Sequence, residues 1–480
     1  MKFASRQRRF VGDTASMTPS EENPYQPSDE VAPALLPESP SGATGITAWL
    51  ERAPGAIFAI YAIGWSFSTY FCMYAFRKPF SVGQFQGLQF LGTGIDLKTA
   101  FVISQILGYT TSKFIGIKVC SEVRREQRAK MLVGTIAIAQ VGLVLFGLAP
   151  NNLKVAAIFL AGLPLGMVWG LVVWYLEGRR TSELLLAGLS CSYIVASSAV
   201  KDIGQTVIRD FGVSEAWMPS VVGWMFLVPF VVSVYFLNQL PGPSAADVAE
   251  RTKRETMDAT HRFAFVRHFL LGMIALIAFY FFLTAYRDFR DNYMPEVLTE
   301  LGLADKEGIF SLIEWPIGFS ILLVMAALSL FRNNRYGLLA VFVVMISGMI
   351  LMGLSTLMLD AQMIDGFWWM VLIGFGAYLA YVPFGSVLFD RMLASTHVVG
   401  TAVFAIYLTD ATGYTGSVIV QLYKDLYQST STRFEFLHAF TYFVAVLGVI
   451  CLVGSCVYFL QHGHRHRRHS PQPSEAIPVS

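Results

Sequence analysis

Twelve long apolar runs between residues 55 and 460 restrict the fold of this chain more than any other feature. An α-helix needs about 20 consecutive, mostly apolar residues to cross the hydrocarbon core of a bilayer. The sequence therefore predicts an all-α, polytopic membrane protein with 12 transmembrane helices. The runs lie near residues 55–79, 97–117, 130–149, 153–176, 184–205, 217–238, 267–292, 308–331, 335–358, 366–389, 398–421 and 437–460.

The composition agrees with a membrane protein rather than a soluble one. Of the 480 residues, 54% are hydrophobic and 14% are charged, and the mean hydropathy is +0.53. A soluble domain carries about a quarter charged residues. A net charge of +2 gives no indication of a nucleic-acid partner. The five cysteines are scattered without metal-ligand spacing, so we expect small buried thiols and neither a metal site nor a cofactor.

The longest connection within the array, residues 239–266, is polar and basic and divides the runs into six and six. We therefore expect two six-helix halves, residues 46–238 and 267–461, joined by 239–266 as a cytoplasmic linker. Residues 1–45 are rich in Pro, Ser and Glu, and no apolar segment follows their basic start. They are expected to be a disordered cytoplasmic tail and not a cleaved signal peptide. Residues 462–480 are expected to form a second polar cytoplasmic tail.

The lysines and arginines of the short connections predict the orientation. One side of the predicted membrane carries fifteen of them and the other carries six. Adding five cations at helix ends to the second side raises its total to eleven, and the bias remains. Cytoplasmic loops carry the excess of Lys and Arg in membrane proteins, so the first side and both termini are expected to be cytoplasmic.

Ionisable residues inside the apolar runs are the strongest functional signal. Each costs about 2.5–3.5 kcal/mol at the bilayer centre unless it has a partner, a cavity or a function. The first run of each half ends in an arginine, Arg77 or Arg287, and the second run carries one buried charge, Lys113 or Glu314. Equivalent helices of two repeats meet near the substrate site, so we expect these four residues to bind a substrate. Snorkelling interfacial anchors are the alternative, but they explain only the arginines.

The types of these residues favour a phosphate group as the ligand. Arginine binds a tetrahedral oxyanion through two parallel hydrogen bonds. Arg77, Lys113 and Arg287 supply three positive charges, and Glu314 removes one. The remainder balances a phosphoryl group, which carries about −1.5 to −2 at neutral pH. We also expect Lys113 and Glu314 to face each other across the site and to pair when it is empty.

Several short motifs recur in the order, and on the helices, where one transporter family has them. They are Arg77-Lys78-Pro79-Phe80, Ser112-Lys113-Phe114-Ile115, Arg287 with Pro295, Glu314 beside Trp315, Ile373-Gly374-Phe375 with Tyr378, and Gly400-Thr401-Ala402 followed by Gly413-Tyr414-Thr415-Gly416. On these motifs, over most of residues 55–460, the chain resembles the major facilitator superfamily. Within it, the chain resembles the organophosphate:phosphate antiporter branch, the bacterial glycerol-3-phosphate and hexose-phosphate carriers.

The resemblance implies two pseudo-symmetric six-helix halves and a secondary active transporter that exchanges a phosphorylated metabolite for inorganic phosphate. It implies that Arg77 and Arg287 face each other and bind the phosphate group, with Lys113 close by. The corresponding expectation is a monomer in the bacterial inner membrane, with a small anionic substrate and the lipid bilayer as its partners. Secondary candidates for the site are Lys78, Arg290, Tyr378, Asp410 and Tyr414.

The chain departs from that branch in three places. Its fifth run has Ser190-Cys191-Ser192-Tyr193 where the glycerol-phosphate carrier has a histidine, and residues 118–124 replace the loop motif Gly-x-x-x-Asp-Arg. The counterpart of that motif after the eighth run, residues 328–335, has no acidic residue. Both arginines remain, so the departures indicate a divergent member of the branch.

Two other functions stay open on the sequence. One is a transporter-shaped receptor that binds a phosphorylated ligand without moving it, and the other is a carrier for a different small organic anion. An intramembrane enzyme is not expected, because His397, Asp390 and Asp410 show neither Ser/His/Asp nor metal-ligand spacing.

Overall fold

The computed structural model describes residues 45–177, 179, 181–243, 247, 269–331, 333–396 and 402–469. The expected N-terminal tail, most of the expected linker, the C-terminal residues 470–480 and His397 lie outside this part of the chain. The described residues form helices and turns without a named strand, so the all-α prediction is confirmed.

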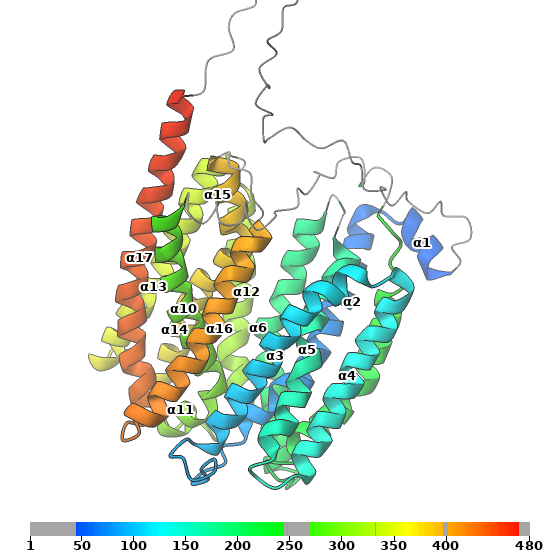
Figure 1. The fold of residues 1–480 in the computed structure, drawn as a ribbon, viewed down its shortest axis with the longest axis vertical. Helices are drawn as coiled ribbons and strands as arrows, with labels where there is room; N and C mark the ends of the chain where they lie inside the picture. Colours follow the sequence, from blue (N-terminus) through cyan, green and yellow to red (C-terminus); the bar gives the residue numbers. More distant parts are fainter. Residues whose placement is uncertain are drawn as a thin grey trace, which may run out of the picture. The chain divides into compact units, whose positions relative to one another are not determined.

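Twelve helices of 18 or more residues account for the twelve predicted runs (Figure 1). The first six are α2 (Gly55–Arg77), α3 (Leu97–Glu122), α4 (Arg125–Leu148), α5 (Lys154–Leu176), α6 (Ser182–Arg209) and α7 (Met218–Leu237). The second six are α10 (Leu270–Asn292), α12 (Ile309–Ser329), α13 (Asn334–Asp360), α14 (Gly366–Pro383), α16 (Ala402–Tyr427) and α17 (Arg433–His469).

Within the described residues, three short α-helices add to this array: α1 (Ile46–Arg52), α11 (Met294–Glu300) and α15 (Phe389–Thr396). The tenth predicted run differs from the prediction because it is not one regular helix. It becomes a π-helical turn over Phe384–Leu388 directly after Pro383. Proline has no backbone N–H to donate to the preceding turn, which makes such a local change of winding favourable.

Three of the twelve long helices are more polar than the rest. Among the described residues, nine helices are apolar and long enough to cross a membrane by composition alone, and α3, α6 and α16 fall short of that test. These three pack where the halves meet, α3 against α16 and α6 against α12. Polar side chains inside a membrane protein normally face its interior or a wet cavity. The polar helices therefore lie where a site between the halves would be.

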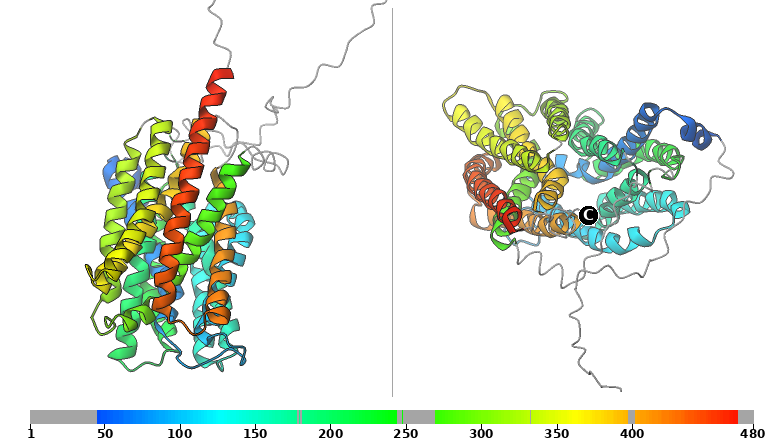
Figure 2. Two further views of the ribbon diagram at one scale, coloured as in Figure 1. Left: turned by 90° about the vertical axis from the view of Figure 1, so that its left-hand side faces the viewer. Right: turned by 90° about the horizontal axis from the view of Figure 1, so that it is seen from above.

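Seen from above, the helices of the two halves form two groups (Figure 2). Each half has its own hydrophobic core. The residues of the first core come almost entirely from α2 to α7, and those of the second from α10 to α17. Two buried residues cross between the halves: Tyr414 packs into the first core and Ile194 into the second. The two halves are thus separate packing units that meet along a narrow seam.

Two glycines of α5 allow α3 to approach closely. A Cβ on Gly162 would lie 2.9 Å from the carbonyl oxygen of Gln105, and one on Gly166 would lie 2.7 Å from the Cβ of Ser112. No side chain fits at such distances, so the glycines fix the position of α3. That helix carries Tyr109 and Lys113, two residues of the candidate site.

Candidate functional site between the halves

The two halves are joined at the end of the bundle where α2 and α10 end, which we call the closed end. Asp291 of α10 is the centre of one group of contacts there. It accepts an ion pair of 2.5 Å from Lys78, which follows α2, and pairs with Lys201 of α6. The hydroxyl of Ser197 also donates to Asp291, at 2.9 Å. One carboxylate thus binds two lysines from the other half.

A second group of contacts joins the halves at the same end. Lys98 of α3 pairs with Glu296 of α11, and the hydroxyls of Thr99 and Tyr293 lie 2.7 Å apart. Arg433 of α17 pairs with Asp96 at 2.6 Å. Burial raises the pKa of the Glu296 carboxyl, although the Lys98 ammonium opposes the shift. In the described part of the chain, the hydrogen bonds and ion pairs between the halves lie at this end or near mid-helix.

Arg77 is the last residue of α2 and lies next to the closed end. Its guanidinium carbon is 3.9 Å from the centre of the Tyr109 ring and 5.7 Å from that of Tyr74. Its Nε is buried without a hydrogen-bond partner, and among the described residues it has no carboxylate partner. The side-chain amide of Gln105 fixes the backbone by donating to the Arg77 carbonyl at 2.8 Å. Aromatic faces hold this cation while its N–H groups remain available to an anion.

Arg287 of α10 has a matching aromatic contact and a different charge environment. Its guanidinium carbon lies 4.0 Å from the centre of the Tyr381 ring. It also forms a 2.7 Å ion pair with Asp288, whose other carboxylate oxygen accepts from Ser417 at 2.8 Å. The charge of Arg287 is therefore already balanced, whereas that of Arg77 is not.

Two tyrosines lie close to both arginines. Tyr74 of α2 and Tyr414 of α16 are each within electrostatic range of Arg77 and of Arg287. The arginines of the two halves therefore belong to one tyrosine-lined site. That the two arginines face each other and contact a substrate stays a prediction.

Lys113 of α3 belongs to the same site and links the two halves. Its ammonium pairs with Asp410 of α16 at 2.9 Å and lies 4.8 Å from the centre of the Tyr414 ring. Tyr280 of α10 donates a hydrogen bond to Asp410 at 3.0 Å. The side chains of Lys113 and Asp410 are 23% and 19% exposed, so the pair faces accessible space rather than the packed core.

Glu314 does not pair with Lys113, and that expectation is wrong. Its carboxylate forms a 2.5 Å ion pair with Arg290, and the Arg290 guanidinium also donates to the Met370 carbonyl at 2.8 Å. Glu314 and Arg290 lie within one half and are only 5% and 3% exposed. A buried carboxylate needs a close counter-ion, and Arg290 of α10 supplies it. The charges of Glu314 and Arg290 therefore neutralise each other within the second half.

The other secondary candidates have distinct positions. Lys78 belongs to the closed end and Asp410 is the counter-ion of Lys113. The ring of Tyr414 contacts the Lys113 ammonium, and Tyr414 is within electrostatic range of both arginines. Tyr378 is buried and within electrostatic range of both Arg287 and Arg290. Its contact with a ligand stays a prediction.

The sequence analysis did not assign roles to two acids at the end of α10. Asp288 pairs with Arg287, and Asp291 pairs with Lys78 and Lys201 of the other half. Their signal was visible in the run Arg287-Asp288-Phe289-Arg290-Asp291, where two acids alternate with two bases at the end of one apolar segment. It also missed Tyr109 and Tyr381, whose rings contact the guanidinium groups of Arg77 and Arg287. Tyrosine is frequent throughout this chain, so their positions in the sequence do not distinguish them.

Comparison with solved structures identifies the fold. The chain is similar to the nucleoside transporter NupG (13% identity, TM-score 0.55, 84% of this chain and 99% of that chain). It is also similar to a D-xylose–proton symporter (16% identity, TM-score 0.54, 83% and 97%). A bacterial homolog of the human lysosomal transporter Spinster, in an inward-facing and unoccupied conformation, matches with 11% identity, TM-score 0.54, and coverage of 90% and 100%. At these identities the likeness establishes the fold alone, which is the major facilitator fold.

Comparison with sequences identifies the family. No curated protein matches the chain. The model of a family of unknown function, DUF5690, matches residues 79–462, which is most of the chain; the match includes Arg287 and begins just after Arg77. The chain therefore belongs to the DUF5690 family.

Proposed function

We propose that this protein is a secondary active transporter for a small organic anion, namely a phosphorylated metabolite that exchanges for inorganic phosphate across the bacterial inner membrane. The observation that carries the proposal is the pair Arg77 and Arg287. One comes from each half, each lies against a tyrosine ring at about the same distance, and two further tyrosines lie close to both. Paired guanidinium groups suit a tetrahedral oxyanion.

Access to this site supports transport. The closed end is held by contacts across the halves, while Lys113, Asp410 and Arg287 inside the long helices keep 23%, 19% and 17% of their side chains exposed. The site is therefore reached from the opposite end, which the loop charges assign to the cytoplasm. We infer that this arrangement is inward-facing, as is the conformation in which the similar bacterial Spinster homolog was solved.

The charge of the site differs from the one expected from the sequence. Arg77, Lys113 and Arg287 are balanced in part by Asp288 and Asp410, which leaves one net positive charge, on Arg77. A phosphoryl group carries about −1.5 to −2 charges at neutral pH. An anion at Arg77 therefore attracts a second cation, and Lys113 is the cation whose present partner can be replaced.

This competition gives a mechanism for alternating access. The Lys113–Asp410 ion pair connects α3 with α16 and so holds the two halves together. A phosphoryl group that takes Lys113 from Asp410 weakens that connection and draws Arg77 and Arg287 together instead. Residues 46–238 and 267–461 act as the two rocking units in this proposal, and 239–266 connects them. The anion supplies the differential binding energy that a change of state requires.

The experiment is counterflow in liposomes that contain the purified protein and are loaded with inorganic phosphate. External phosphate esters, sulfate and simple carboxylates are added in turn. We expect exchange with phosphate and at least one phosphate ester. Exchange with carboxylates or sulfate only would indicate that the substrate is another small anion and not a phosphate compound. Binding without exchange would indicate the receptor function.

A further inference from the structure

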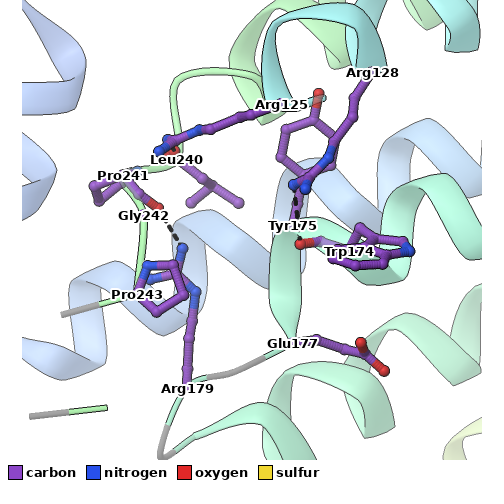
Figure 3. Close-up of a pocket in the computed structure, with 10 residues that line it drawn as sticks. All are labelled: Arg125, Arg128, Trp174, Tyr175, Glu177, Arg179, Leu240, Pro241, Gly242 and Pro243. Atoms are coloured by element: carbon purple, nitrogen blue, oxygen red, sulfur yellow. Dashed lines mark hydrogen bonds between the residues drawn. The ribbon is translucent and has the colours of Figure 1, made fainter. Parts of the chain in front are cut away.

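A second basic site lies at the other end of the bundle from the closed end. It is a cavity of about 170 Å³ between the start of α4, the end of α5 and the segment that follows α7 (Figure 3). Its charged lining residues are Arg125, Arg128, Arg179 and Glu177, and Trp174 and Tyr175 form its aromatic wall. We call it the α4–α5 arginine pocket. It shares no residue with the site between the halves.

Two of its arginines build the pocket wall. Arg125 donates to the carbonyl of Leu240, and Arg179 donates to that of Pro241 at 2.5 Å. Both side chains point toward the segment 240–243 (Figure 3). The Nε of Arg179 is buried without a hydrogen-bond partner. The wall is therefore held in place while one donor inside it stays unsatisfied, which is costly for a buried polar group.

The third arginine is held by an aromatic ring. The guanidinium carbon of Arg128 lies 4.9 Å from the centre of the Trp174 ring, and its terminal nitrogen donates to the Trp174 carbonyl at 3.4 Å. Among the described residues it has no carboxylate partner. This geometry leaves N–H groups of Arg128 free to bind an oxyanion in the fork arrangement.

The charges of the pocket need an anion. Arg125 and Arg128 lie in the first turn of α4, where the helix dipole is positive and a cation is unfavourable. Burial lowers the pKa of the Arg179 guanidinium to about 10, and the nearby charge of Arg125 adds to this shift while Asp247 opposes it. Three guanidinium groups and one carboxylate, that of Glu177, line the cavity, so the lining keeps a net positive charge that a bound anion balances.

We propose that the α4–α5 arginine pocket binds a phosphoryl group, supplied either by the headgroup of an anionic phospholipid or by a free phosphate. The carrying observation is that three guanidinium groups line one cavity, with a buried free donor on Arg179 and no carboxylate partner for Arg128. Trp174, which is 37% exposed, gives the pocket the aromatic surface typical of a membrane interface. This proposal does not depend on transport by the site between the halves.

The test uses full-length protein with Arg77→Gln, so that phosphate binding between the halves does not contribute. Binding is measured by native mass spectrometry and by thermal unfolding with three probes: short-chain phosphatidylglycerol, phosphatidylcholine with the same chains, and inorganic phosphate. The test variant is Arg128→Gln, because Arg128 does not hold segment 240–243. The matched control is Arg124→Gln, an exposed arginine that does not line the cavity.

We expect Arg128→Gln to weaken binding of the anionic probe about tenfold or more, as the loss of a charged hydrogen bond predicts, and Arg124→Gln to leave it unchanged. Arg128→Lys, which keeps the charge and loses the fork, should weaken it less. Binding of phosphatidylglycerol without free phosphate identifies a lipid headgroup, and binding of both identifies a general phosphate site. Equal affinity in Arg128→Gln and Arg124→Gln, or preference for phosphatidylcholine, overturns the proposal.

Discussion

Arg77 lies with its guanidinium carbon 3.9 Å from the centre of the Tyr109 ring, and Arg287 repeats this contact at 4.0 Å from Tyr381. The two contacts come from different halves, although the tyrosines lie on non-equivalent helices, Tyr109 on the second long helix of its half and Tyr381 on the fourth. A cation over an aromatic face gains about 0.5–2 kcal/mol, depending on its solvation. That energy orients each guanidinium plane without using its hydrogen-bond donors.

The first prediction concerns these arginines as a unit. Arg77→Lys and Arg287→Lys keep the charge but lose the planar fork, so each should reduce phosphate exchange about tenfold or more. The double variant should be little worse than either single one, because the two arginines bind one phosphate group together and either change already breaks that arrangement. The measurement is phosphate counterflow in liposomes. Arg52→Lys, at an exposed arginine of α1, is the matched control. Normal exchange by both single variants would contradict joint binding of phosphate by Arg77 and Arg287.

The second prediction concerns Lys113 and Asp410, the ion pair between α3 and α16. Asp410→Asn removes the competitor for Lys113, so the apparent affinity for phosphate should rise while turnover falls. Lys113→Ala should lower both affinity and turnover. Initial rates of exchange over a range of phosphate concentrations separate the two parameters. The competition is refuted if Asp410→Asn changes neither of them.

The third prediction assigns Glu314 and Arg290 to stability. Removing one partner of a buried ion pair leaves an uncompensated charge and costs about 3–5 kcal/mol. Glu314→Gln and Arg290→Gln should therefore each lower the unfolding temperature in detergent, and Arg290→Met with Glu314→Leu should recover most of the loss. If Glu314→Gln left the unfolding temperature unchanged and abolished phosphate binding, Glu314 would instead be a residue of the binding site.

The fourth prediction concerns the closed end. Asp291→Asn leaves Lys78 and Lys201 without their shared carboxylate, so the two lysines repel and this end should open more often. A single cysteine at Ser197, which contacts Asp291, should then react faster with a membrane-impermeant thiol reagent in intact cells. Asp210→Asn, at an exposed residue near the same end, is the control. Equal labelling rates in both backgrounds would show that Asp291 does not hold the end closed.

The fold was predictable from the sequence because the length of an apolar run is a direct requirement of the bilayer. The arginines were predictable for a related reason, since a charge inside such a run needs an explanation wherever it lies. The π-helical turn after Pro383 was not predicted, because a proline allows a change of winding without requiring it.

The partners of the charges could not be predicted from the sequence. Glu314 had two candidate cations, and the packing of both α10 and α12 against α14 brings it to Arg290 rather than to Lys113. The contacts of Asp291 join residues that are 90 or more positions apart and exist only when both halves are folded together. Pairing of this kind depends on which face each helix presents, and hydropathy does not report that.

The central claim is that phosphate binds between Arg77 and Arg287, and direct titration of purified protein with inorganic phosphate tests it. The titration is best done in the Arg128→Gln background, so that the α4–α5 arginine pocket does not contribute. We predict saturable binding by calorimetry that is lost in Arg77→Gln and retained in Arg52→Gln. Binding of equal affinity in Arg77→Gln, or no binding in any of these proteins, would contradict the account.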